Sequence, residues 1–301
     1  MKRLFYLLVL LGLFDDKARA QLSWQTLNVP GAVSTWIDGI DGENIVGSFL
    51  LPNQSSLTGF LYNRQTAVWT YLTAPGYDWT LPLAISGNTI VGSAGSNTSY
   101  LRNGFSFQNS SGWSFLNSPQ HGSDLEAYGI DGSNIVGGTS SGWSYIYDGT
   151  GWTHFNSPFG DGSSADGISG NTIVGTYYSN SNYLRGGFIK NENNWTLLNV
   201  PGAVETLPRD VDGNVIIGQF RETNSGPTRS FLYNGGSLIY LDAPTAESTY
   251  AYGVDGETIV GSYNDSSGAS HGFILTVPEP SAFSLVAVVL GGWAMIRRRR
   301  S

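Results

Sequence analysis

The chain has 301 residues, 40 glycines, no cysteine and a formal net charge of −8. Removing residues 1–20 and 277–301 takes away eight of the 15 basic and three of the 23 acidic residues, so seven and 20 remain and the net charge of 21–276 is −13. Without disulfides a hydrophobic core must stabilise this segment, and its negative charge excludes nucleic acid as a partner.

The first 20 residues have the pattern of a secretory signal peptide. Lys2 and Arg3 precede an apolar run from Leu4 to Phe14, and Ala18 and Ala20 form an A-x-A cleavage site. The apolar run is too short to span a bilayer. We therefore expect export by the Sec machinery and cleavage after Ala20.

Residues 21–276 contain a six-fold internal repeat. One phrase, "GIDGENIVGSF" at Gly39, returns five times with an aliphatic residue, Asp-Gly or Ser-Gly, and an I-V-G or I-I-G run. The last glycines of these runs are Gly47, Gly92, Gly137, Gly175, Gly218 and Gly261. A second phrase, W-x5-P, begins at Trp24, Trp69, Trp113, Trp152 and Trp195, with Leu238 in the sixth place. Since Leu replaces Trp, we expect these side chains to pack between repeats.

Each repeat predicts four short strands and almost no helix. The first strand ends at the Asp-Gly or Ser-Gly turn, the second is the I-V-G run, the third resembles "GFLYN" at Gly59, and the fourth begins at the Trp. Four strands in about 40 residues match a propeller blade. The fold class is therefore all-β, a six-bladed β-propeller. The alternatives are a linear array and a two-sheet sandwich.

The two ends of the repeat region complement each other. The region begins with a fourth strand, "LSWQTLNVPG", and ends after a third strand, "GFILT". We expect residues 22–30 to lie beside residues 270–276, so that the N-terminal strand completes the last blade and closes the ring.

The sixth repeat, "AYGVDGETIVGSYNDSSGASHGFIL", resembles the extracellular repeats named HAF. His271 matches the histidine of that pattern, and Gly272 stands where the pattern has alanine. The resemblance implies an exported repeat protein and no particular chemistry.

A catalytic or metal centre is not predicted. His121, His154 and His271 occupy different repeat positions, which disfavours a metal cluster. Aspartates recur before the turn glycine at Asp41, Asp131, Asp212 and Asp255, but Ser86 and Ser169 take the same place. A turn-forming role explains both residue types, and a calcium ring is the alternative. We therefore expect no cofactor.

One position varies while its neighbours do not. It lies eight or nine residues after each conserved proline and is occupied by Asp38, Leu83, Tyr128, Asp166, Arg209 and Tyr252. A ring of dissimilar polar side chains at the propeller mouth suits a polar ligand. Trp36, Trp79 and Tyr250 lie nearby in sequence and would stack on sugar rings. The alternative is that the varying residues are only solvated.

Residues 277–301 form a three-part tail. Pro278, Glu279 and Pro280 precede an apolar segment, 281–296, and the arginines Arg297, Arg298, Arg299 and Arg300. The segment is long enough for a short membrane helix, and the arginines would hold its end in the cytoplasm. The plain interpretation is a C-terminal anchor.

The tail also resembles the PEP-CTERM sorting signal, whose motif, hydrophobic helix and arginine cluster appear here in the same order. The resemblance implies exosortase as a partner, transient attachment to the inner membrane of a Gram-negative-type bacterium, and final placement at the cell surface or in the exopolysaccharide matrix.

Together these patterns predict a non-catalytic, exported surface or matrix protein that associates with exopolysaccharide or another surface protein. The alternative is a glycan-active hydrolase or lyase that uses Asp38, Asp166 and Arg209, which requires two facing carboxylates.

Overall fold

The computed structural model describes residues 22–98, 102–122, 124–179 and 185–277. The predicted signal peptide, with Ala18 and Ala20, and the predicted tail from Pro278 to Arg300 lie outside these residues. Gln25–Ile274 form one compact unit.

Every regular element in the described part of the chain is a strand, as the sequence predicted. The strands are β1 (Ser23–Thr26), β2 (Ser34–Asp41), β3 (Asn44–Leu50), β4 (Thr58–Asn63), β5 (Val68–Leu72), β6 (Trp79–Ser86), β7 (Thr89–Gly95), β8 (Arg102–Gln108), β9 (Gly112–Phe115), β10 (Leu125–Asp131), β11 (Asn134–Thr139), β12 (Ser144–Tyr147), β13 (Trp152–Phe155), β14 (Gly162–Ser169), β15 (Thr172–Tyr178), β16 (Arg185–Asn191), β17 (Asn194–Leu198), β18 (Glu205–Asp212), β19 (Val215–Arg221), β20 (Arg229–Asn234), β21 (Ser237–Leu241), β22 (Ser248–Asp255), β23 (Thr258–Asn264) and β24 (Ser270–Thr276). No helix among the described residues has the length and apolar content to cross a membrane.

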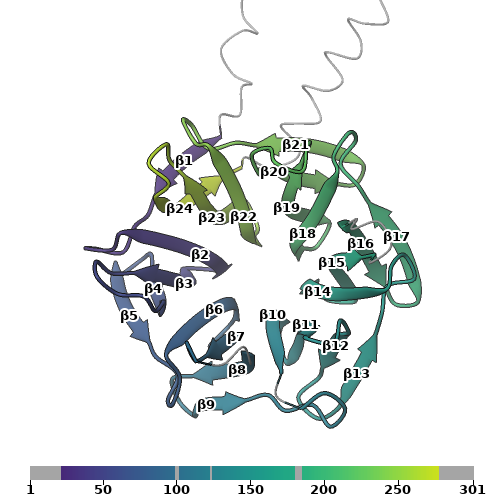
Figure 1. Ribbon diagram of the computed structural model, residues 1–301, viewed down its shortest axis with the longest axis horizontal. Helices are drawn as coiled ribbons and strands as arrows, with labels where there is room; N and C mark the ends of the chain where they lie inside the picture. Colours follow the sequence, from purple (N-terminus) through teal and green to yellow (C-terminus); the bar gives the residue numbers. More distant parts are fainter. Residues whose placement is uncertain (1–21, 99–101, 123, 180–184, 278–301) are drawn as a thin grey trace, which may run out of the picture. The chain divides into compact units, whose positions relative to one another are not determined.

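Each sequence repeat folds as an antiparallel meander around a common axis. The first strands β2, β6, β10, β14, β18 and β22 lie nearest the axis, and β5, β9, β13, β17 and β21 lie at the rim (Figure 1). Hydrogen bonding groups the strands into two four-stranded and two eight-stranded sheets. Each larger sheet is two meanders joined by one parallel residue pair, Asn103 with Leu125 or Arg185 with Glu205. The sheets are therefore fewer than the six separate ones that the repeats predict.

The glycine that ends each I-V-G run is required by close packing. A Cβ atom on any of these six glycines would fall within 3.0 Å of a carbonyl oxygen of the preceding strand. On the other side, an aromatic ring of the third strand fills the space, as Phe231 does beside Gly218. Only glycine lets the first and third strands approach the second this closely.

The hydrophobic core lies between meanders. Val46, Leu72 and Ala74 of the first meander pack with Ile85 and Phe105 of the second, and the other core clusters are built in the same way. The repeated tryptophans were predicted to pack between repeats. Trp113 lies at the edge of one cluster, where its ring is 4.9 Å from that of Phe105 in its own meander. A contact between repeats occurs at Trp195, whose ring lies 5.9 Å from that of Phe155 in the preceding meander. Packing between neighbours therefore stabilises every meander, which none could achieve alone.

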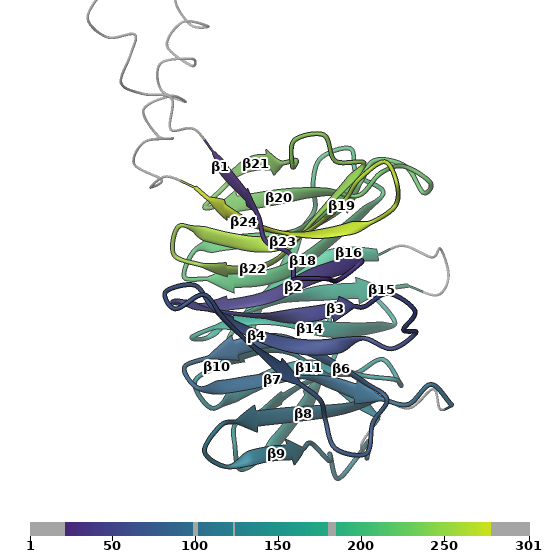
Figure 2. The same ribbon diagram turned by 90° about the vertical axis from the view of Figure 1, so that its left-hand side faces the viewer.

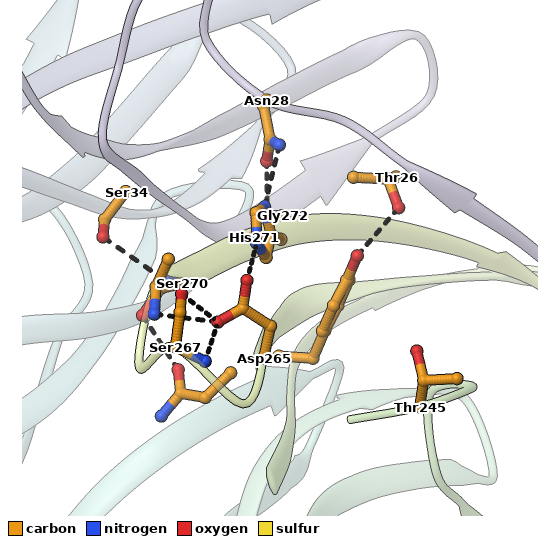
Figure 3. A network of polar contacts seen from close by, with 12 residues as sticks. Thr26, Asn28, Ser34, Thr245, Asp265, Ser267, Ser270, His271 and Gly272 are labelled. Carbon is orange, nitrogen blue, oxygen red and sulfur yellow. Dashed lines mark hydrogen bonds and ion pairs between the residues drawn. The ribbon is translucent and has the colours of Figure 1, made fainter. Parts of the chain in front are cut away.

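The first and last repeats meet as the sequence predicted. β1 lies beside β24 and pairs with it (Figure 2). The Leu27 N–H donates to the Gly272 carbonyl at 2.9 Å, and Ile274 packs with Ile37 in one core cluster. Polar side chains reinforce the junction (Figure 3). The His271 Nε2 lies 2.9 Å from the Asp265 carboxylate, and its Nδ1 lies 3.0 Å from the Asn28 amide nitrogen.

Asn28 ties the N-terminal segment to the backbone as well, because its Oδ1 accepts the Gly272 N–H at 3.2 Å. The amide oxygen is thereby fixed, and the amide NH₂ must face the histidine. His271 then carries its proton on Nε2 and donates it to Asp265. The histidine that matches the HAF pattern thus contributes to ring closure.

Candidate functional site

A β-bulge in each first strand creates the site. The pairing of every first strand with its neighbour shifts by one residue in mid-strand, between Ile37 and Gly39 in β2 and at equivalent places in the other five. The extra residues are Asp38, Leu83, Tyr128, Asp166, Arg209 and Tyr252, the six that vary in the sequence. A bulge redirects a side chain out of the alternating pattern, which explains why this position escapes the constraints on its neighbours.

An axial cavity of about 130 Å³ extends from the bulges to the turns that end the first strands. Its lining includes Asp38, Tyr128, Arg209 and Tyr252 at one end and Asp41, Asp131, Asp212 and Asp255 at the other. The volume is sufficient for several water molecules or a small polar group. No residue that precedes a bulge contributes to the lining.

This geometry corrects the predicted mouth. The varying residues lie within strands rather than at the loops that follow the conserved prolines, and the cavity continues toward the Asp-Gly turns at the other end of each strand. Trp36, Trp79 and Tyr250 precede the bulges and do not line it. Trp79 packs over Gly95, and the Tyr250 ring stacks on Tyr252 at 6.3 Å. Their spacing in the sequence predicted that these three residues lie near the varying ones. Each first strand, however, runs from them to the bulge and then along the cavity, so they lie outside the lining.

Among the described residues that line the cavity, Arg209 is the only basic one. Its Nη2 donates to the Gln219 Oε1 at 3.4 Å, and its guanidinium lies 6.0 Å from the centre of the Tyr252 ring. Its Nε is buried and has no hydrogen-bond partner within the described residues. The guanidinium therefore retains unused donor capacity at the cavity.

Asp38 supplies an acceptor across from this donor. Within the described residues no hydrogen bond to its carboxylate is seen, and burial raises its pKa to about 7 although the charge of Arg209 acts in the opposite direction. Burial likewise raises the pKa of Tyr252 to about 12. At neutral pH the cavity thus presents a carboxyl group near its titration midpoint, a guanidinium and phenolic hydroxyls.

Asp166 is not part of the lining. Its two carboxylate oxygens accept hydrogen bonds from the hydroxyls of Ser164, at 3.0 Å, and Thr176, at 2.9 Å. Burial raises the pKa of Asp166 to about 6, and Arg209 and the two hydroxyls oppose that shift. Of the predicted ligand-face residues, the structure therefore brings together Asp38, Tyr128, Arg209 and Tyr252 at the cavity. Asp166 is buried outside the cavity lining.

Asp210 is a lining residue that the sequence analysis missed. It stands where the other repeats have Gly39, Ala84, Gly129, Gly167 and Gly253, small residues that pack against the next first strand. Its carboxylate accepts the backbone N–H groups of Val211, at 2.8 Å, and Val254, at 2.9 Å, and burial raises its pKa to about 7. The sequence feature that could have identified it is one acidic residue at a repeat position that is glycine or alanine in the other five repeats.

The Asp and Ser side chains at the turns form a closed ring of hydrogen bonds. Each accepts the backbone N–H of the turn glycine in the next repeat, so that Asp131 binds Gly170 at 2.6 Å and Ser169 binds Gly213 at 3.1 Å. The last, Asp255, binds Gly42 of the first repeat at 2.7 Å. The side chains were expected to bond their own turn, and they instead join neighbouring turns. Either residue type suffices because each needs one acceptor oxygen.

A second cavity lies beside Tyr128. It is lined by Arg102, Asp124, Glu126 and Thr139 among others, and Tyr128 borders both cavities. Glu126 accepts from the Tyr128 hydroxyl at 2.5 Å and pairs with Arg102 at 2.7 Å. Within the described residues no group of three or more His, Asp or Glu side chains is arranged to hold a metal ion.

No protein-family model matches the chain, and no curated protein matches it. Solved structures do. TolB from Acinetobacter baumannii superposes with a TM-score of 0.51 at 14% identity, over 80% of this chain and 66% of that one. The β-propeller domain of the Trilobed protease from Pyrococcus furiosus gives a TM-score of 0.49 at 9% identity, over 81% and 94%. The ring of meanders and the likeness to TolB establish a β-propeller fold, and at this identity they establish the fold alone.

Proposed function

We propose that this protein is an exported, non-catalytic propeller of six blades that binds a hydroxyl-rich ligand at its axial cavity, which accommodates one small polar group of that ligand. The observation that carries the proposal is the presence in one cavity lining of an unpartnered acceptor, Asp38, and a guanidinium, that of Arg209, for which a single hydrogen bond is seen within the described residues. A sugar hydroxyl donates to the first and accepts from the second, so one ligand satisfies both.

The blade count rests on the ring of turn hydrogen bonds. It has six members, each joins one repeat to the next, and the bond from Gly42 to Asp255 returns it to its start. The single residue pairs that merge meanders into eight-stranded sheets are contacts between neighbouring blades in this proposal.

Export and sorting rest on the sequence and are compatible with the fold. All described strands lie between the predicted signal peptide and the predicted tail, so removal of both would leave every strand intact. The absence of cysteine and the net charge of −13 suit a soluble protein outside the cell. In this proposal exosortase removes the tail, and the protein enters the cell surface or the exopolysaccharide matrix.

Mass determination of the mature protein tests the sorting proposal. We expect the N-terminus at Gln21 and loss of the segment after the Pro278-Glu279-Pro280 motif. Replacing all three motif residues by alanine should leave the protein attached to the inner membrane. Unchanged surface display after exchange of the tail for a generic anchor would contradict exosortase sorting.

Titration of the protein with purified exopolysaccharide and its constituent sugars tests the ligand proposal. We expect binding that Arg209→Gln weakens at least tenfold. Arg229→Gln is the matched control, because Arg229 pairs with Asp242 outside the cavity. Equal affinities of the two variants for the sugar would show that the ligand does not bind at the axial cavity.

A glycan-active enzyme remains the second candidate, favoured by the raised pKa values of Asp38 and Asp166. Of these two, only Asp38 lines the cavity, and the other lining aspartates accept backbone N–H groups. A glycosidase needs two carboxylates at the scissile bond. Release of reducing ends from the bound polysaccharide by the wild type, and its loss in Asp38→Asn, would establish the enzyme in place of the binding protein.

A further inference from the structure

Two of the three histidines in the chain lie against each other in the third repeat. His121 is in the loop between β9 and β10, and His154 is on β13. The loop is held by two backbone hydrogen bonds between Ser118 and Gly122. The centres of the imidazole rings are 4.7 Å apart and their planes differ by 53°. From the sequence these histidines were expected to lie apart, because their repeat positions differ.

Each ring has one nitrogen bound to a serine hydroxyl. The His121 Nδ1 lies 3.1 Å from the Ser141 Oγ, and the His154 Nε2 lies 3.1 Å from the Ser118 Oγ. The remaining nitrogen of His154, Nδ1, is buried and has no partner, and no hydrogen bond to the His121 Nε2 occurs within the described residues. A hydrogen bond on one nitrogen and a vacant second nitrogen is the usual state of a metal-ligating histidine, whose ring is oriented by the first contact.

The separation of the rings also suits a shared ion. A divalent metal lies about 2.0–2.1 Å from an imidazole nitrogen and hence about 3.2 Å from the ring centre. Two rings that meet at angles between 90° and the tetrahedral value then have centres roughly 4.5–5.2 Å apart. The observed 4.7 Å falls within this interval.

The contact of His154 with Ser118 is compatible with a metal on the other ring nitrogen. With a metal on Nδ1 the proton resides on Nε2, where the Ser118 hydroxyl oxygen accepts it.

We propose that the His121–His154 pair binds one divalent transition-metal ion, with water completing its coordination. Imidazole nitrogen favours copper, nickel and zinc over calcium and magnesium, and affinity rises to copper in that series. Two protein ligands leave open positions on the ion. The site is outside the axial cavity and does not depend on the proposed function.

The test uses the full chain without a histidine tag. Titration calorimetry with Zn²⁺ and with Cu²⁺ should give one ion per chain, and electron paramagnetic resonance of the copper form should show hyperfine coupling to two nitrogens. His121→Ala and His154→Ala should each lower the affinity at least tenfold and remove one coupled nitrogen. His271→Ala is the matched control, since that residue lies at the ring junction, and it should retain both couplings.

Folding of each variant is checked by circular dichroism, and His154→Gln, which preserves much of the side-chain volume, replaces His154→Ala if the latter unfolds. Ser141→Ala provides a second reading, because loss of the orienting hydroxyl should weaken binding without removing a nitrogen coupling. The proposal is overturned if the wild type binds neither ion, or if the double variant lacking both histidines binds as tightly as the wild type.

Discussion

Gly218 illustrates how one residue type is fixed by its surroundings. A Cβ atom there would meet the Leu207 carbonyl oxygen and the Phe231 ring, both parts of the packed interior. The repeated glycine is a sequence pattern that required the structure for its explanation. The same reason applies at each of the six I-V-G positions.

Gly218→Ala should therefore lower the free energy of unfolding by at least about 2 kcal/mol, because neither backbone nor ring has room to move. Gly151→Ala is the control: a Cβ atom there would lie 3.8 Å from its nearest neighbour, and the change should stay within about 0.5 kcal/mol. Urea denaturation of both variants measures the difference. Similar midpoints for the two variants would show that the close approach is not rigid.

Asp38 links a single carboxyl group to the pH dependence of stability. Its pKa is raised to about 7 in the folded protein, so the folded state holds the proton more tightly than the unfolded chain, where the pKa is 3.8. Its contribution to stability is therefore complete below pH 4 and is lost as the pH rises through 7.

Asp38→Asn removes that titration. The fall in unfolding free energy between pH 5 and pH 8 should become smaller than in the wild type by on the order of 1 kcal/mol. Asp78→Asn should leave the fall unchanged, because hydrogen bonds from Ser96 and Asn97 lower the pKa of Asp78 and move its titration below this interval. Thermal unfolding measured at each pH tests this prediction. If the stability of the wild type and of Asp38→Asn falls equally between pH 5 and pH 8, Asp38 is not the group responsible.

At the scale of elements, the first strands hold the ring together at both their bulges and their ends. The bulges give five side chains to the axial cavity, and the terminal Asp or Ser of each strand binds the next turn. The sequence predicted the strands, the turns and the variable position. It did not predict the bulge, because the residues on either side of it are mostly glycine, alanine or proline and show no clear alternation of apolar and polar side chains.

Replacement of Asp131 tests the bond between neighbouring turns. Asp131→Ser should be nearly neutral, since Ser86 and Ser169 fill the same role, whereas Asp131→Ala leaves the Gly170 N–H to solvent and should cost about 1 kcal/mol. Equilibrium unfolding compares the two variants. Equal stability of the Ala and Ser variants would argue against the bond, and a lower melting temperature in the presence of a calcium chelator would favour the calcium alternative.

At the scale of the whole molecule, the chain closes on itself through residues more than 240 positions apart. Asn28 contacts both His271 and Gly272, and β1 completes the sheet of β22, β23 and β24. Closure removes two exposed sheet edges that would otherwise pair with other chains. Loss of the closure should therefore promote aggregation as well as unfolding.

A double-mutant cycle on Asn28→Ala and His271→Ala measures the closure. The two changes should be non-additive by about 0.5–1.5 kcal/mol, because they remove the two partners of one contact. Asn63→Ala combined with His271→Ala should be additive, since Asn63 bonds Asn44 in another meander. Additivity in the first pair would mean that the backbone pairing alone closes the ring.

The sequence by itself determined the repeat, the four strands of each unit, the turns between them and the complementary ends, because these depend on local residue patterns of fixed spacing. Tertiary structure decided which side chains meet. The direction of the first strands separates Trp36 and Trp79 from the cavity, the internal hydrogen bonds of Asp166 keep it outside the cavity lining, and the fold of one loop brings His121 to His154. Such contacts join residues whose spacing carries no pattern, so they follow only from the packed chain.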